Sequence, residues 1–302
     1  MKTLLKYSFI ISILVLIIIS CDELIPVQLV EDTELNNDAT SVVIVPEDEA
    51  GYDSTGTITD AGDLYTNLIT ATGTRTTYQK TDVYKNYYDA LFFDKNSPLV
   101  IENKIIGYFG RILGDVYFNK VKANKTGNKL SFENDFMIKT DSIFGIRHNL
   151  VSRIYFNQNE ADLPYGSTIE FTLDAYIGST ITYNFPTPEK INGNVTIRKA
   201  GKNQNSEIRI RWDGTNNGQI EIAIGSMKDL DSPLRPIYRF SSPDDGVYNI
   251  PASLTNAINF DGFDILVVTL IRTVTTELKS LDNLSDNYFM AQSIHNIRIN
   301  VR

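Results

Sequence analysis

The sequence has 302 residues, a length that suggests one or two domains, each able to bury a core of its own. Its hydrophobic content of 42% and aromatic content of 11% are those of a globular protein. The net charge of −9 is unevenly placed: residues 22–63 hold twelve acidic and no basic residues, whereas residues 75–302 hold 26 basic and 25 acidic residues. This near-neutral part lacks the basic surface that nucleic-acid binding requires, so we expect no nucleic-acid partner.

The first 21 residues have the layout of a secretory signal. Lys2 and Lys6 give a positively charged start, Phe9–Ile19 is an almost unbroken apolar run, and Ser20 and Cys21 follow it. The run is short for a transmembrane helix, which needs roughly 20 apolar residues. An uncleaved anchor and a plain cleaved signal are nevertheless two alternative interpretations of this segment.

The end of the segment, Ile18-Ile19-Ser20-Cys21, resembles the lipobox of bacterial lipoproteins. The resemblance implies that residues 1–20 are removed as a signal peptide and that Cys21 becomes the acylated first residue, carrying palmitate-like chains. Cys21 is the only cysteine in the chain, so it cannot form an internal disulfide, and acylation removes a free thiol from an exported protein. We therefore expect the lipid on Cys21 to hold the protein in the cell envelope, at the outer membrane.

We expect residues 21–75 to form a disordered acidic tether, because like charges dominate this stretch and apolar residues are scarce. One apolar island, Ser41–Pro46, is expected to form a short strand and to dock on the folded body. The Thr-rich stretch Thr66–Thr77 is interpreted as a continuation of the linker that could hold a short strand.

The remainder predicts an all-β fold of two consecutive antiparallel β-sandwich-like domains, because short strand patterns alternate with turn signals. The first domain is expected over residues 76–185, where Thr168–Asp174 alternates apolar and polar side chains. Pro186 and Pro188 mark the domain boundary, since prolines in close succession cannot belong to a central strand.

The second domain is expected over residues 186–302. Glu207–Trp212 alternates cleanly, Asp245-Gly246 predicts a tight hairpin, and Ser253–Ile258 is the one stretch that looks briefly helical. The region also resembles an immunoglobulin-like or fibronectin-like sandwich module of bacterial envelope lipoproteins. The residues that carry this resemblance are Trp212, the Asp245-Gly246 turn, and Ile250-Pro251 followed by Leu254. This resemblance implies a fold and no activity.

The sequence assigns no catalytic, cofactor or metal-binding residue. His148 and His295 are the only histidines, and a zinc site needs three or four ligands, while Cys21 is used elsewhere. We expect His148 in a loop or at a strand end, and His295 at the surface or a sheet edge. No Gly-x-Ser-x-Gly elbow is present to expose a serine nucleophile.

Acidic residues and the single tryptophan leave alternatives open. Asp229, Asp231, Asp244 and Asp245 lie in turn-like segments and could bind calcium, but they lack EF-hand spacing, so ordinary turn chemistry is the preferred explanation. A carboxylate pair for glycoside hydrolysis is also open. Trp212 is expected in the C-terminal core and not on a sugar-stacking platform, because its strand places it on the apolar face.

These features together predict a lipid-anchored cell-envelope protein with non-catalytic binding or scaffolding β domains and no cofactor. A carbohydrate-binding accessory lipoprotein is the first alternative, and an envelope hydrolase with a carboxylate-based site is the second. The expected partners are the membrane, through the lipid on Cys21, and an envelope protein or a glycan.

Overall fold

The computed structural model describes residues 41–44, 66–101, 104–133, 139–153, 162–198, 207–230, 232–282 and 284–301, all within one compact unit. Strands form nearly all of the regular structure in these ranges, so the predicted all-β class is confirmed. The helical exceptions among them are α2 (Ala252–Ala257), at the predicted position, and the 3-10 turn η2 (Phe260–Gly262). Within the described ranges, no helix has the length and apolar character needed to cross a membrane.

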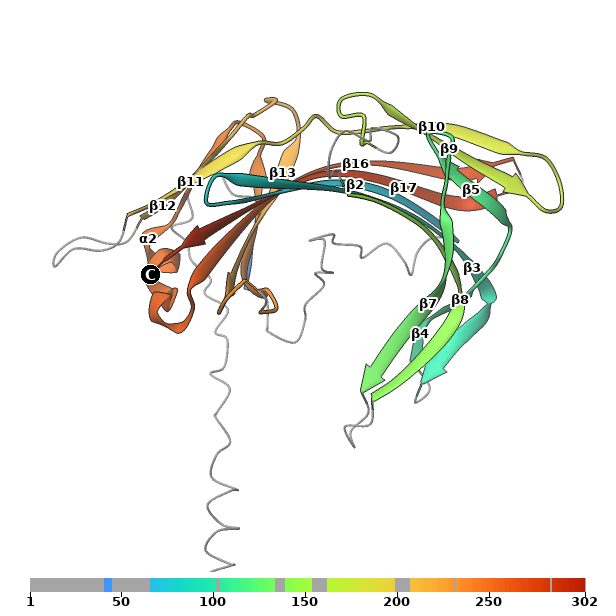
Figure 1. Ribbon diagram of the computed structural model, residues 1–302, viewed down its shortest axis with the longest axis horizontal. Helices are drawn as coiled ribbons and strands as arrows, with labels where there is room; N and C mark the ends of the chain where they lie inside the picture. Colours follow the sequence, from blue (N-terminus) through green and yellow to red (C-terminus); the bar gives the residue numbers. More distant parts are fainter. Residues whose placement is uncertain are drawn as a thin grey trace, which may run out of the picture. The chain divides into compact units, whose positions relative to one another are not determined.

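The largest element is a ten-stranded sheet (Figure 1). Its strands run in the order β1-β14-β13-β16-β17-β2-β3-β8-β7, with β4 paired to the far part of β3. All neighbours are antiparallel except β17 and β2, which are parallel. The bounds, in spatial order, are β1 (Ser41–Ile44), β14 (Arg235–Pro243), β13 (Gln219–Met227), β16 (Ile265–Leu281), β17 (Leu284–Asn300), β2 (Asn67–Tyr78), β3 (Thr81–Ile101), β8 (Lys139–Arg153), β7 (Asn124–Glu133) and β4 (Lys104–Gly110).

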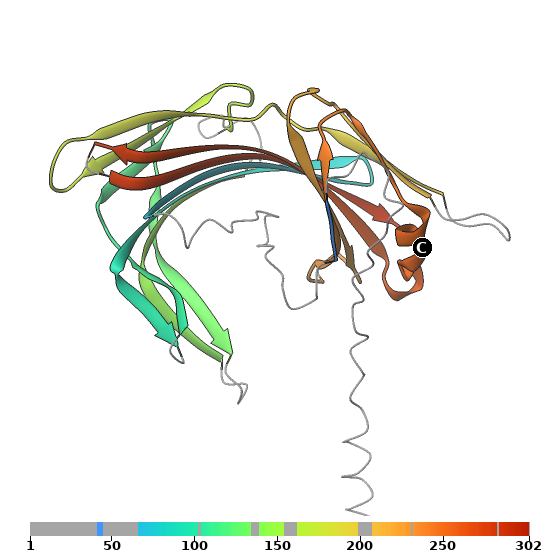
Figure 2. The ribbon, with the colours of Figure 1, turned by 180° about the vertical axis from the view of Figure 1, so that it is seen from behind.

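Two smaller sheets pack on one face of the long sheet (Figures 1 and 2). The first has the order β10-β9-β5-β6 and the second β11-β12-β15. Phe289 belongs to the hydrophobic core under the first small sheet, and Ile297 belongs to the core under the second. These two side chains of β17 lie on the same face of the strand, because they are an even number of residues apart. The bounds are β5 (Gly114–Phe118), β6 (Val121–Lys122), β9 (Thr168–Ala175), β10 (Ile181–Pro186), β11 (Gly193–Arg198), β12 (Glu207–Trp212) and β15 (Val247–Ile250).

Each small sheet closes its own hydrophobic core against the long sheet. Beneath β9 and β10, Phe171 and Phe185 contact Phe289 at ring-centroid distances of 5.8 and 5.3 Å. Beneath β12, Ile208 and Ile210 are fully buried in the second core. The expected boundary at residue 186 coincides with the end of β10, yet the long sheet is continuous across both cores because β17 pairs with β2.

The structure corrects the end of the predicted tether. Thr66–Thr77 is almost wholly β2, a central strand that pairs with β17 on one side and β3 on the other. Its first eight residues are buried, with Ile69 and Ala71 facing the core. β-branched threonines suit a pleated strand, and few apolar side chains are needed when only alternate positions meet the core. The predicted docking of the upstream island is confirmed, because β1 pairs antiparallel with β14.

The Asp245-Gly246 hairpin is also corrected. The turn has Gly246 at φ +94°, a conformation that favours glycine, but the strands it joins lie in different sheets. β14 pairs with β1 and β13, whereas β15 pairs with β12. The turn therefore carries the chain from the long sheet to the small sheet above it, and local turn chemistry does not distinguish this crossing from a hairpin.

Candidate functional site

The chain between β10 and β11, here called the crossing segment (Thr187–Asn192), runs over β2 and β17. The Ile191 backbone N–H donates to Ser293 Oγ at 2.9 Å, and the Arg75 Nη1 donates to Asn192 Oδ1 at 2.7 Å. Gly193, the first residue of β11, donates its N–H to His295 Nδ1 at 2.9 Å. These bonds bring polar groups from three separate parts of the sequence together at one place, here called the polar junction (Arg75, Ile191, Asn192, Gly193, Ser293 and His295).

The sequence suggested that His295 lies at the surface or a sheet edge, but it lies at the centre of this junction. Its side chain is almost fully buried in β17. Burial, and to a smaller extent the nearby Arg75 charge, lower the pKa of His295 to about 4. The ring is therefore neutral near pH 7. Sequence reasoning missed this environment because its partners, Thr77 and Gly193, are far away along the chain.

The hydrogen bonds around His295 fix where its proton lies. Because Gly193 donates to Nδ1, the single proton of the neutral ring must be on Nε2. Nε2 then donates to Thr77 Oγ1 at 2.8 Å, and Thr77 donates to Asp82 Oδ1 at 2.5 Å. The three side chains resemble a nucleophile–base–acid series, but His295 cannot accept a proton from Thr77 in this arrangement. The network links β2 to β17, and His295 does not serve as a base for the Thr77 hydroxyl.

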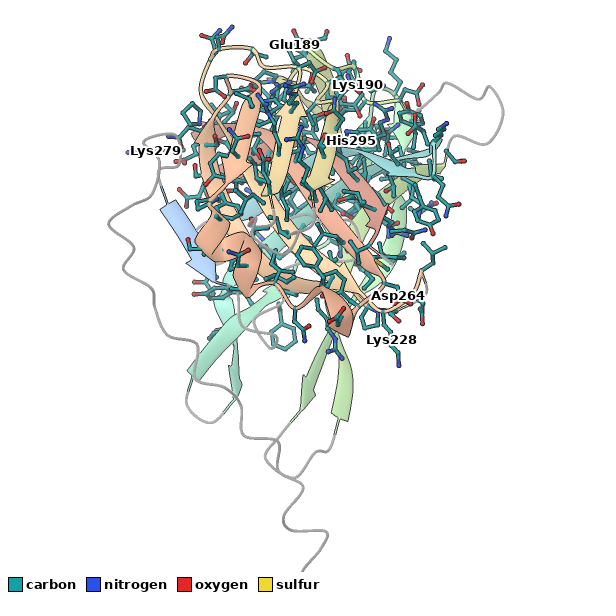
Figure 3. The ribbon with its side chains drawn as sticks, turned by 90° about the vertical axis from the view of Figure 1, so that its left-hand side faces the viewer. Glu189, Lys190, Lys228, Asp264, Lys279 and His295 are labelled. Atoms are coloured by element: carbon teal, nitrogen blue, oxygen red, sulfur yellow. The ribbon has the colours of Figure 1, made fainter. Side chains whose placement is uncertain are left out.

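A half-buried group of cations and aromatic rings, the cation–tyrosine cluster (Arg75, Tyr84, Tyr165 and Lys190), covers the junction. Lys190 Nζ lies 4.7 Å from the ring centre of Tyr84 and 5.8 Å from that of Tyr165. Arg75 lies over Tyr84 at 5.9 Å and forms an ion pair with Asp82 at 2.8 Å. The hydrogen bond from Arg75 lowers the pKa of Asp82 despite some burial. Figure 3 labels Glu189, Lys190 and His295, all in the upper part of that view.

A buried ion pair lies next to the junction. Arg272 donates to both carboxylate oxygens of Asp244, at 2.8 and 2.9 Å, and both residues are almost fully buried. Trp212 Nε1 and Thr215 Oγ1 also donate to Asp244, at 2.8 and 2.7 Å. Burial works to raise the pKa of Asp244, but these donors outweigh it and hold the pKa below its usual value. Asp244 is thus a structural anion whose oxygens are already occupied.

The other sequence candidates can be placed on the same structure. Trp212 is confirmed as a core residue, with 7% of its surface exposed. Asp229 accepts from Ser232 Oγ at 2.7 Å, and Asp245 accepts from the Val247 N–H at 3.2 Å, which is ordinary turn chemistry. Cys21 and Asp231 lie outside the described residues. In the part of the chain that the structure describes, no group of three or more His, Cys, Asp or Glu side chains could hold a metal ion.

His148 is the second histidine whose predicted position is corrected. It lies within β8, fully buried, with its ring edge-on to Phe92 at 5.8 Å between centroids. Neither ring nitrogen has a hydrogen-bond partner in the described structure. Burial lowers the pKa of His148 to about 4, so the ring is neutral near pH 7. A buried histidine without partners is destabilising in itself, and no local sequence signal indicates it.

The described residues thus define an all-β protein with two cores on one sheet and a polar junction between them. No protein-family model matches the sequence, and no curated protein matches it. Among solved structures, the yeast delta-COP-I mu-homology domain is similar at 7% identity, over 76% of this chain and 97% of that chain, with a TM-score of 0.31. The same domain complexed with the Dsl1 WxWxV peptide gives 7% identity, the same coverage and a TM-score of 0.30. Scores this low leave the function to be argued from the site.

Proposed function

We propose that this protein is a lipid-anchored protein of the bacterial cell envelope whose β-sandwich-like body binds or scaffolds a protein or glycan partner without catalysing a reaction. The observation that supports the non-catalytic part is the proton position on His295, which makes this ring a hydrogen-bond donor to Thr77 and not its base. The lipobox-like Ile18-Ile19-Ser20-Cys21 supports the anchor. The lipid chains implied by that resemblance would give lasting attachment, since one chain alone holds weakly.

The cation–tyrosine cluster is the surface that we assign to partner binding. Its charges and ring faces lie outside both hydrophobic cores, apart from Tyr165, which packs on the edge of the first core. Burial raises the pKa of Tyr165 to about 12, so this hydroxyl stays protonated and can donate a hydrogen bond. A partner that presents acceptor oxygens, from a glycan or an acidic side chain, matches these donors. The buried position of Trp212 removes the platform on which the carbohydrate alternative first depended.

The anchor is tested by replacing Cys21 with serine in cells fed a palmitate analogue. The wild-type protein should take up label and fractionate with membranes, and Cys21→Ser should take up none and be released. Ser12→Ala, within the same apolar run, keeps the cysteine and serves as the matched control. Membrane-bound Cys21→Ser, together with an unlabelled wild type, would contradict the anchor.

Partner binding is tested with the full chain by pull-down from envelope extracts and by a glycan array. Lys190→Glu reverses one charge of the cation–tyrosine cluster and should abolish capture of the partner. Lys279→Glu, on an exposed residue in the outer part of β16, is the control and should leave capture unchanged. Equal capture by both variants would move the binding surface elsewhere, and turnover of a glycan by the wild type would favour the hydrolase alternative.

A further inference from the structure

The hairpin formed by β9 and β10 can be followed in Figure 1. Exposed apolar side chains lie at its end. The apolar tip consists of Ile112, Tyr176 and Ile177, whose exposed fractions are 50%, 63% and 93%. The Tyr176 N–H donates to the Leu113 carbonyl at 2.9 Å, so the hairpin tip and the loop before β5 lie side by side. An isoleucine this exposed at a hairpin end contributes nothing to the cores described above.

Basic side chains flank the apolar tip. Lys125 donates a hydrogen bond to the Tyr176 hydroxyl and lies 4.8 Å from its ring centre. Lys122 and Lys125 share the carboxylate of Asp115, each at 2.5 Å, and these hydrogen bonds lower the pKa of Asp115 to about 2. Arg111 is exposed in the adjoining loop. Asp115 offsets part of the charge of Lys122 and Lys125, and the Asp94 carboxylate interacts with the Arg111 charge.

We propose that the apolar tip inserts into the headgroup region of an anionic phospholipid bilayer. A tyrosine beside an exposed aliphatic side chain suits the membrane interface, where the ring lies at headgroup level. Lysines nearby keep their charged ends in water and contact lipid phosphates. A stable protein partner needs a broad contact area, which a narrow hairpin end does not offer. Insertion into lipid requires only a small apolar group.

This inference rests on the proposed lipid anchor for the nearness of a bilayer. Residues 21–41 span at most about 70 Å even when fully extended, so an acylated Cys21 would keep β1 within that distance of the membrane. The tip would then provide a second, weaker contact that orients the body. The anchor would reinforce the weak contact of the tip, because it raises the local concentration of lipid around the tip.

The experiment places an environment-sensitive dye at the tip of the full chain. Ile177→Cys is labelled in the protein reconstituted into vesicles of equal parts phosphatidylethanolamine and phosphatidylglycerol, some carrying quenchers on their acyl chains. Leu230→Cys, in the turn after β13, replaces an apolar side chain that is 45% exposed and is the control. We expect blue-shifted emission and quenching at position 177 and neither at position 230. Lys122→Glu should reduce the quenching at 177, as should replacement of phosphatidylglycerol by phosphatidylcholine.

The design separates failure of the tip from failure of the anchor. Cys21 is the only native cysteine, so one dye per chain means that it is acylated, whereas two dyes per chain contradict the proposed function. The Cys21→Ser/Ile177→Cys variant carries one thiol and tests the tip without an anchor, at saturating lipid. Dye at 177 that stays unquenched with and without the anchor overturns the inference. A blue shift that needs envelope protein and shows no lipid quenching overturns it as well, in favour of a protein partner.

Discussion

Replacing Asp244 with asparagine should destabilise the protein strongly, because it leaves the buried Arg272 without a counter-charge. Asp244 accepts four hydrogen bonds, two of them from Arg272, and the pair is almost fully buried. Removing one partner of a buried ion pair costs about 3–5 kcal/mol. For a unit of this size the melting temperature should fall by roughly 6–20 °C. Thermal unfolding followed by circular dichroism measures the change directly.

Glu221→Gln supplies the matched control. Glu221 and Arg239 form a similar two-pronged ion pair at 2.9 Å, but both side chains are substantially exposed. Such pairs contribute about 0–1 kcal/mol, so this variant should melt within a few degrees of the wild type. A double variant, Asp244→Leu with Arg272→Met, removes both charges and should lose less stability than the two single losses added together. If Asp244→Asn melts like Glu221→Gln, the argument from burial is refuted.

Three further predictions follow from buried side chains. Trp212→Ala should cost about 3–5 kcal/mol, and wild-type tryptophan fluorescence should be blue-shifted and poorly quenched by iodide; emission like that of free tryptophan would contradict burial. Because the folded state holds the pKa of His148 near 4, well below its usual 6.5, stability is full above pH 6.5 and falls as the pH drops toward 4, by about 2 kcal/mol at pH 5. His148→Phe should reduce that acid dependence in melting curves at pH 7 and 5 and leave the share that comes from His295, whose pKa is also about 4; an unchanged slope would count against it. Gly73→Ala should cost about 1–3 kcal/mol, since an added Cβ would lie 2.2 Å from the Tyr165 hydroxyl; an undiminished melting temperature would show that Tyr165 moves away freely.

The sequence predicted those features that depend on local alternation. The placement of Ile208, Ile210 and Trp212 on one buried face follows from the two-residue period of a strand. The strand β1 and the short helix α2 could be predicted for a similar reason, because each is a short segment whose residues differ in character from those beside it. Each of these predictions needed only residues within a few positions of the one concerned.

The junction could not be predicted because distant residues create its chemistry. His295 owes its proton position to Gly193 and Thr77, which are 102 and 218 residues away in the sequence. The same holds for β2, whose polar composition resembles a linker until β17 is placed beside it. Composition gives only the mean apolar content of a stretch. The threonines on one face of β2 lower that mean, so a central strand has the composition of a linker.

The parallel pairing of β17 with β2 sets an order on folding. Asn67 and Asn287 are register partners 220 residues apart, and closing that loop costs about 3 kcal/mol more than closing a ten-residue loop. Contacts of such long range slow folding and leave strand edges exposed while the chain is being made. Until β17 emerges, one edge of β2 is an open template for wrong pairing. A substitution in β17 would thus act on both cores at once and lengthen the time for which the nascent chain is prone to aggregate.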